Sequence, residues 1–385
     1  MQRLPTIAAI VEQHAGDAAF LWVRRGAEVR GRRFGEADLG RLDQRLSAHL
    51  AGLAAAGEAA WMAALAQFAD WPEAGEVFVL GALALRCGEP PLVARALEAG
   101  TGAGEAGWRG LSGAVARVTP ERLRPFVADW LASADPMLRR LGAAALSHHR
   151  ADGRGRLTAL LGDRDPTVRA RALRLVGELG RRDAAPALQA AFGDADEAAR
   201  FWAAWSACLV GDRGRAAPVL DGLAEAGGRF AAAAVATRLA TAPAEEARSW
   251  LQRWIGRDPV PLVTELGAAG DRGLVPWLIG RMRTPATAFD AGAAFRDLFA
   301  IDFDSTDLFT EAPETLGPGF AAVEEHPLPV ADRIEAWWDE GRGRFAAEDR
   351  PSMRQLGLGA LRAAAADPGR PLADWRRTRR YPAWS

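Results

Sequence analysis

The sequence contains no lysine and no asparagine, so its 48 basic residues are all arginines, against 49 acidic residues. The net charge of -1 excludes the overall positive charge of a dedicated nucleic-acid-binding protein. The two cysteines, Cys87 and Cys208, lie far apart and predict no disulfide scaffold. No apolar run approaches the roughly 18 residues of a membrane span. The apolar stretch within the first ten residues is also too short for a signal-peptide core. We therefore expect a cytoplasmic protein.

Motifs of known chemistry are also scarce. Residues 102–107 fit the dinucleotide-binding string G-x-G-x-x-G, but a helical pattern at 91–99 precedes them instead of a strand, which favours a flexible loop. His148 and His149 are adjacent and would point about 100° apart on a helix, which disfavours a metal pair. The sequence has no nucleophile elbow, P-loop or cysteine–histidine pair. We expect no cofactor and no metal, and an enzyme is not indicated, although a site without a known motif stays open.

A five-residue pattern recurs in the middle of the chain. Asp-Pro-x-x-Arg occupies residues 135–139 and 165–169, and the related Asp-Glu-Ala-Ala-Arg occupies residues 196–200. Small and apolar residues follow each copy at helical spacing, which predicts a helix with one packed face.

Prolines indicate a second helix in the repeat. Pro186, Pro218 and Pro276 each follow a glycine-containing turn, and proline is best tolerated in the first turn of a helix. The unit is then an antiparallel helix pair of about 31 residues, stacked on its neighbours so that each pair buries a face that it cannot bury alone. This predicts an all-α solenoid without a substantial sheet.

The repeat resembles the HEAT family, in the short form also called HEAT-like or phycobilisome-lyase-type repeats. The likeness rests on the turn Asp, on the apolar–Arg pair that opens the second helix, and on the proline of the first helix. Three clear copies cover roughly 130–225, a degenerate copy 228–256 and a partly matching copy 258–300. The resemblance implies a solenoid and no particular activity, and the chain lacks the His-Glu pairs of the iron-binding HEAT hydroxylases.

Other segments resemble a narrower family. They are residues 13–22, 42–53, 75–78, 200–207, 275–280, 336–338 and 343–345. This family is a set of proteobacterial HEAT-repeat proteins of unknown biochemical function, often encoded in or beside type VI secretion gene clusters. The resemblance implies type VI secretion cargo, or its delivery machinery, as the partner.

We divide the chain into four regions. Residues 1–105 predict an N-terminal helical domain, and residues 106–300 the HEAT-like solenoid. Residues 301–328, which are rich in acids and contain no arginine, predict an acidic linker or loop. Residues 329–385 predict a partly irregular C-terminal segment with a helix and a basic tail.

The repeated Asp and Arg predict a structural ladder. At equivalent repeat positions an Asp can cap a helix, and a partly buried Arg can bridge adjacent turns. We interpret these residues as structural and not catalytic: Asp135, Arg139, Asp165, Arg169, Asp196 and Arg200.

The other side of the second helices predicts a binding strip. If Val168 and Val176 are buried, Arg171 and Arg174 lie on the opposite side of their helix. HEAT solenoids place this side on their concave surface, where the resemblance puts Leu141, Ala144, His148, Arg171, Arg174, Glu178, Trp202, Trp205 and Leu209. Tryptophan beside arginine is typical of protein-binding hot spots. The alternative is that both tryptophans pack against the fourth repeat or the C-terminal segment.

We therefore interpret the protein as a non-enzymatic protein-binding scaffold: an adaptor, chaperone or cognate-binding protein. One alternative is a nucleic-acid binder of the HEAT-like DNA glycosylase type, for which the basic stripe is too sparse. Another is a HEAT-like lyase acting on a modified protein, which only the shape of the repeat supports. The oligomeric state cannot be predicted from these patterns.

Overall fold

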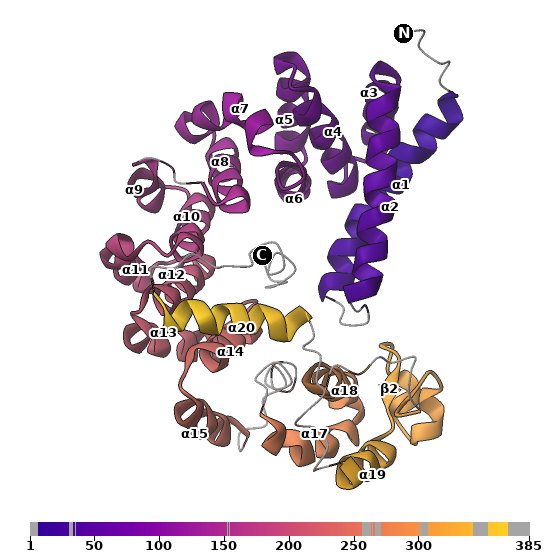
Figure 1. Ribbon diagram of the computed structural model, residues 1–385, viewed down its shortest axis with the longest axis vertical. Coiled ribbons are helices and arrows are strands. Elements are labelled where there is room, and N and C mark those ends of the chain that lie inside the picture. Colours follow the sequence, from indigo (N-terminus) through magenta and orange to yellow (C-terminus); the bar gives the residue numbers. More distant parts are fainter. Residues whose placement is uncertain are drawn as a thin grey trace. The chain divides into compact units, whose positions relative to one another are not determined.

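A computed structural model describes residues 7–30, 34, 36–151, 153, 155–255, 263, 265, 271–299, 301, 307–341 and 353–368 (Figure 1). The predicted fold class is confirmed, because the described chain is built from helices that pack in pairs. Its strands are one antiparallel pair of two residues each, β1 (Phe309–Thr310) and β2 (Leu328–Pro329). No helix of the described part is both long and apolar enough to cross a membrane.

The chain forms two compact units, one ending at Leu179 and the other beginning at Gly180. This boundary lies inside the repeat region predicted for residues 106–300. Each unit has its own buried apolar side chains.

Unit 1 is a series of helices in which most neighbours along the chain pack side by side, the exceptions being α6 with α7 and α8 with α9. They are α1 (Ala8–Arg30), α2 (Glu36–Ala56), α3 (Glu58–Asp70), α4 (Ala74–Cys87), α5 (Pro90–Gly102), α6 (Gly104–Val115), α7 (Pro120–Ala132), α8 (Pro136–His149), α9 (Arg156–Leu161) and α10 (Pro166–Leu179). The second helices of the pairs also contact one another, because α6 packs on α8 and α8 on α10. The core of the unit includes Phe78, on which Trp22 stacks at a ring distance of 4.8 Å.

The glycine-rich segment 102–107 is not the flexible loop that the sequence suggested. Helices α5 and α6 meet with Ala103 as the one residue between them. A Cβ atom on Gly107 would lie 1.8 Å from the carbonyl oxygen of Gly100, so the two helices cross at backbone contact. Gly107 is needed for this close crossing, and Gly104 has a positive φ of 60° at the junction between the helices, so two glycines of the string have structural reasons without a nucleotide.

Unit 2 continues the pairs and adds a C-terminal part. Its helices are α11 (Ala185–Ala190), α12 (Glu197–Val210), α13 (Arg213–Ala226), α14 (Ala231–Thr241), α15 (Ala244–Ile255), α17 (Val275–Met282), α18 (Pro285–Phe299), α19 (Ala331–Gly341) and α20 (Met353–Ala366), with short 3₁₀ turns at Arg182–Ala184, Ala191–Gly193, Arg272–Leu274, Pro313–Leu316 and Phe320–Ala322. Within the acidic segment, Phe320 and Leu328 are buried against Ala288 of α18. The basic tail at 376–380 lies outside the described residues.

Of the three repeat prolines expected to begin a helix, two do so. Pro186 and Pro276 occupy the first turns of α11 and α17. Pro218 lies inside α13, so the expected start there was wrong. Helix α13 begins earlier, at Arg213, because Gly211 ends α12 in the left-handed conformation and the chain reverses at once.

Three aspartates cap the second helices of the repeats. In each, the Oδ1 atom accepts a backbone N–H from the first turn and so satisfies a donor that the helix leaves unpaired. The pairs are Asp135 with Met137 (2.8 Å), Asp165 with Thr167 (2.9 Å) and Asp196 with Ala199 (2.8 Å).

Three arginines fix the turn that precedes each of these helices. In each, Nη1 donates to two backbone carbonyls of that turn. The acceptors are Ser133 and Ala134 for Arg139 (3.0 and 2.8 Å), Asp163 and Arg164 for Arg169 (2.9 and 3.0 Å), and Asp194 and Ala195 for Arg200 (2.7 and 3.0 Å).

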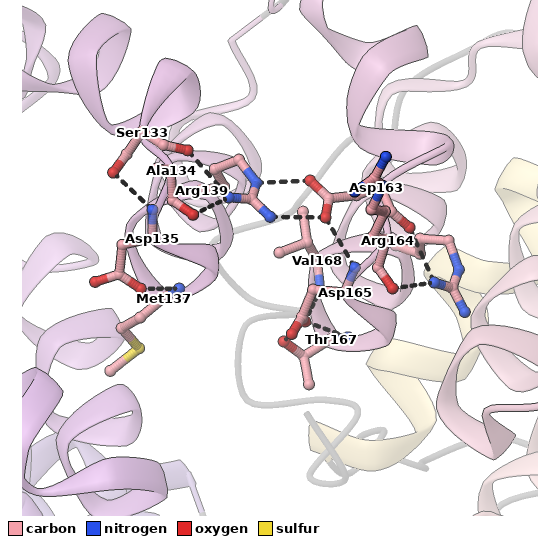
Figure 2. A network of polar contacts seen from close by, with 11 residues as sticks. Ser133, Ala134, Asp135, Met137, Arg139, Asp163, Arg164, Asp165, Thr167 and Val168 are labelled. Atoms are coloured by element: carbon pink, nitrogen blue, oxygen red, sulfur yellow. Dashed lines mark hydrogen bonds and ion pairs between the residues drawn. The ribbon is translucent and has the colours of Figure 1, made fainter.

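Arg139 also joins its turn to the turn of the next repeat (Figure 2). Its Nε and Nη2 atoms donate to the two carboxylate oxygens of Asp163, at 2.6 and 2.8 Å. Asp163 in turn accepts the backbone N–H of Asp165 at 2.9 Å. The acid of this bridge is therefore not the capping Asp of the repeated pattern but the residue two positions before it.

We expect Arg139→Ala to lower the free energy of unfolding by about 1 to 3 kcal/mol, because Asp163 would stay mostly buried without its partner. Arg200→Ala is the matched control, since it removes two carbonyl contacts of the same kind and its described acceptors include no carboxylate. Denaturant unfolding measures both. Equal losses in the two variants would show that the bridge to Asp163 adds nothing.

The bridge also predicts a pH dependence. The hydrogen bond from Arg139 lowers the pKa of Asp163 below its ordinary value. A lowered pKa in the folded state stabilises the fold above the unfolded pKa of about 3.9, and this stability is lost as the pH falls through the folded pKa. The difference in unfolding free energy between the wild type and Asp163→Asn should thus shrink from pH 7 toward pH 3. A difference that stays constant over this range would contradict the bridge.

Candidate functional site

The residues of the predicted strip fall into two groups, one in each unit. Unit 1 holds Leu141, Ala144 and His148 on α8, and Arg171, Arg174 and Glu178 on α10. Unit 2 holds Trp202, Trp205 and Leu209 on α12. Within each unit the structure brings the group together, and the two groups differ in chemistry.

Glu178 is the centre of the unit 1 group. Its side chain is 1% exposed, and its carboxylate accepts from Arg174 Nε at 2.6 Å and from the hydroxyl of Ser147 on α8. Arg150, at the end of α8, donates to the backbone carbonyl of Glu178 at 3.1 Å. The acid is therefore already engaged: it forms a buried ion pair with Arg174 within α10, and Ser147 links this pair to α8.

Arg171 lies beside this pair and differs from its neighbours. Burial and the positive charge of Arg174 lower its pKa to about 9, so it remains protonated at neutral pH at an energetic cost. Its Nε atom is enclosed, and no described residue accepts a hydrogen bond from it. The side chain as a whole is partly exposed. The nearby acid is Glu178, whose charge raises the pKa of Arg171 but which is already paired with Arg174, so Arg171 has no ion pair of its own among the described residues.

Arg140 extends the group toward α6. Its guanidinium lies 3.7 Å from the ring centre of Trp108 and donates to both carboxylate oxygens of Glu105, at 3.0 and 3.3 Å. On the same side, Ser112 Oγ and His148 Nε2 are 3.3 Å apart. We call Trp108, Arg140, Arg171, Arg174 and Glu178 the α6–α10 cluster.

Sequence reasoning missed part of the α6–α10 cluster. Trp108 and Arg140 were not assigned to the strip, because α6 lies outside the recognised repeats and Arg140 precedes the strip position Leu141. Leu141 itself is buried in the core. The position of Arg140 next to Leu141 could have indicated it. No sequence signal near Trp108 indicates its contact with Arg140.

The unit 2 group is an aromatic core, and the expectation that its indoles face solvent was wrong. Trp202 and Trp205 are 6% and 0% exposed and meet edge to face at 5.4 Å. Phe201 of α12 stacks on Phe230, directly before α14, at 4.7 Å, and Trp202 contacts both rings. The alternative interpretation, in which the tryptophans pack within the fold, is the one the structure supports.

Two further groups of α12 are also enclosed. Trp205 Nε1 is buried and has no hydrogen-bond partner among the described residues. Cys208 is buried on the same helix, and burial raises the pKa of its thiol to about 11. Across the described residues, no group of three His, Cys, Asp or Glu side chains is placed to hold a metal ion.

Comparison with known proteins identifies the repeat. A model of the HEAT repeats matches residues 154–240, which include α10, α12 and α14. No curated protein and no solved structure shows significant similarity to the chain. The match covers less than a quarter of the sequence and carries the fold of that segment.

The core position of Trp205 leads to a test. Trp205→Ala should lower the free energy of unfolding by about 3 to 5 kcal/mol, because it leaves a large cavity. Trp205→Phe should cost far less, since it keeps most of the apolar volume and removes an N–H without a described acceptor. Thermal or denaturant unfolding compares the two. Wild-type stability of Trp205→Ala would show that the indole is not part of the core.

Proposed function

We propose that the protein is a non-enzymatic protein-binding scaffold, and that the α6–α10 cluster binds an acidic segment of its partner. HEAT repeats serve in general as surfaces for protein binding, and residues 154–240 match them. The observation that supports this site is Arg171, a desolvated cation whose Nε atom has no described acceptor and whose nearest acid, Glu178, is already paired with Arg174.

A carboxylate is the ligand that this arrangement favours. A guanidinium offers N–H donors in a planar fork that fits a carboxylate, and pairing would offset the cost of burying the charge. Trp108 is 9% exposed and belongs to the core of unit 1, so the accessible part of this contact is the partly exposed guanidinium of Arg140, which stacks on the indole. A partner segment with an Asp or Glu would meet Arg171 beside this stacked guanidinium.

Nucleic acid is the less favoured ligand. Two of the three arginines in the α6–α10 cluster are already paired, Arg140 with Glu105 and Arg174 with Glu178. A phosphate backbone requires a row of unpaired cations, and the carboxylates here would repel it. The same acids do not prevent a single carboxylate from reaching Arg171.

The identity of the partner rests on resemblance. The narrower family likeness suggests type VI secretion cargo or its delivery machinery, which makes the protein an adaptor, chaperone or cognate-binding protein. The partner is proposed by analogy, and the experiment that tests the site also tests the identity of the partner.

The experiment compares Arg171→Met with Arg164→Met in tagged full-length protein purified from its native host, with bound proteins identified by mass spectrometry. Arg164 is exposed in the turn before α10 and serves as the matched control. Partners that bind through Arg171 should be retained by the wild type and by Arg164→Met. Their capture by Arg171→Met should fall at least about tenfold, or roughly 1.4 kcal/mol.

Stability separates a binding role from a structural one. Removing a buried charge without a described partner should leave the melting temperature of Arg171→Met unchanged or raised. A lowered melting temperature with undiminished partner capture would mean that Arg171 supports the fold. The proposal would then be wrong.

A further inference from the structure

Helix α20 lies across second helices of unit 2. It packs on α14 and α12, and it also reaches α18 (Figure 1, yellow). Leu361 and Ala364 are 2% and 5% exposed, whereas Arg362 and Ala363 between them are exposed. The buried residues are three positions apart and so share one face of the helix. Just after the helix, Pro368 lies against Gly211 at the end of α12.

The helical conformation of α20 depends on its packing against α12 and α14. The helix has 14 residues and contains Gly357 and Gly359, which weaken a helix by their backbone freedom. Helices of this length are marginal in water when isolated. Formation of α20 and its docking are therefore coupled, so α20 is a candidate for local unfolding.

The helices beneath α20 are mostly apolar, but their buried residues also include Ser206, Thr237, Arg238 and Thr241, of which Arg238 is paired with Asp221 and Glu246. In α12 every residue from Phe201 to Val210 is buried, and in α14 every residue from Ala233 to Thr241. Some of this burial belongs to α13, which packs on both, and some to α20. If α20 left, alanine-rich backbone would be uncovered, and such a surface admits another helix at close range.

We propose that the α12–α14 face is a helix-binding site, that α20 is its intramolecular occupant, and that a partner helix presenting leucine and alanine three residues apart displaces it. The chemistry of the occupant is taken from α20, whose Leu361 and Ala364 meet this face. The site is built from other residues than the α6–α10 cluster, so either proposal can hold without the other.

The test uses two substitutions on adjacent positions of α20 in the full-length chain. Ala364→Glu places a charge in the contact, whereas Ala363→Glu places the same charge on the exposed side. Amide hydrogen exchange in α12 and α14 should be at least tenfold faster in A364E than in the wild type, with A363E unchanged. Equal exchange in both variants would show that α20 does not cover this face.

A synthetic peptide of residues 353–368 then asks whether the uncovered face binds a helix. In the wild type and in A363E the tethered α20 competes at an effective concentration in the millimolar range. The peptide should therefore bind A364E at least tenfold more tightly than either, and it should restore the slow exchange of α12 and α14. Fast exchange in A364E without binding of the peptide would overturn the helix-binding site.

Two further measurements keep the result interpretable. Leu361→Ala loosens the contact without adding charge and should shift exchange and peptide binding in the same direction as A364E, which guards against misfolding of the charged variant. Light scattering reports the mass in solution. A wild-type dimer in which A364E restores the monomer would show that α20 occupies a second copy of the chain, contrary to the proposal.

Discussion

The Arg139–Asp163 bridge shows how the described repeats of unit 1 are held in register. A helix pair buries only part of its apolar surface, and two pairs can slide against each other unless their turns are fixed. One guanidinium does this by donating to two carbonyls of its own turn and to both oxygens of a carboxylate in the next. The capping carboxylates orient each second helix, so the positions on its other side, including the α6–α10 cluster, follow from the same turn.

Equivalent positions of successive repeats perform different physical tasks. On α10 they hold Arg171 and Arg174, beside one buried acid; on α12 they hold Trp202 and Trp205 inside an aromatic core. A repeat preserves the geometry of its backbone and caps, because these decide whether pairs stack. The side chains between the caps are free to differ, which is how one architecture contains a charged group in one unit and an apolar one in the other.

Much of the repeat could be predicted from the sequence because its chemistry is local. Asp135 caps a helix through a contact two residues away, and Pro186 marks a helix start by its own ring. Asp163 was missed because the partner of Arg139 is chosen by the packing of the next repeat, although an Asp also stands two positions before the cap at Asp194. The burial of Trp202 could not be decided, since it depends on elements that local periodicity does not place.

The alkylation rate of Cys208 reports how often the buried face of α12 becomes exposed. With a thiol pKa of about 11, only about one molecule in ten thousand carries the reactive thiolate at pH 7, and burial excludes reagents from it. Alkylation of this cysteine therefore requires that the surrounding helices open, and its rate reports how often they do. Because Cys87 is exposed, the modification of Cys208 must be located in the sequence, but the wild-type chain then reports local opening without an engineered residue.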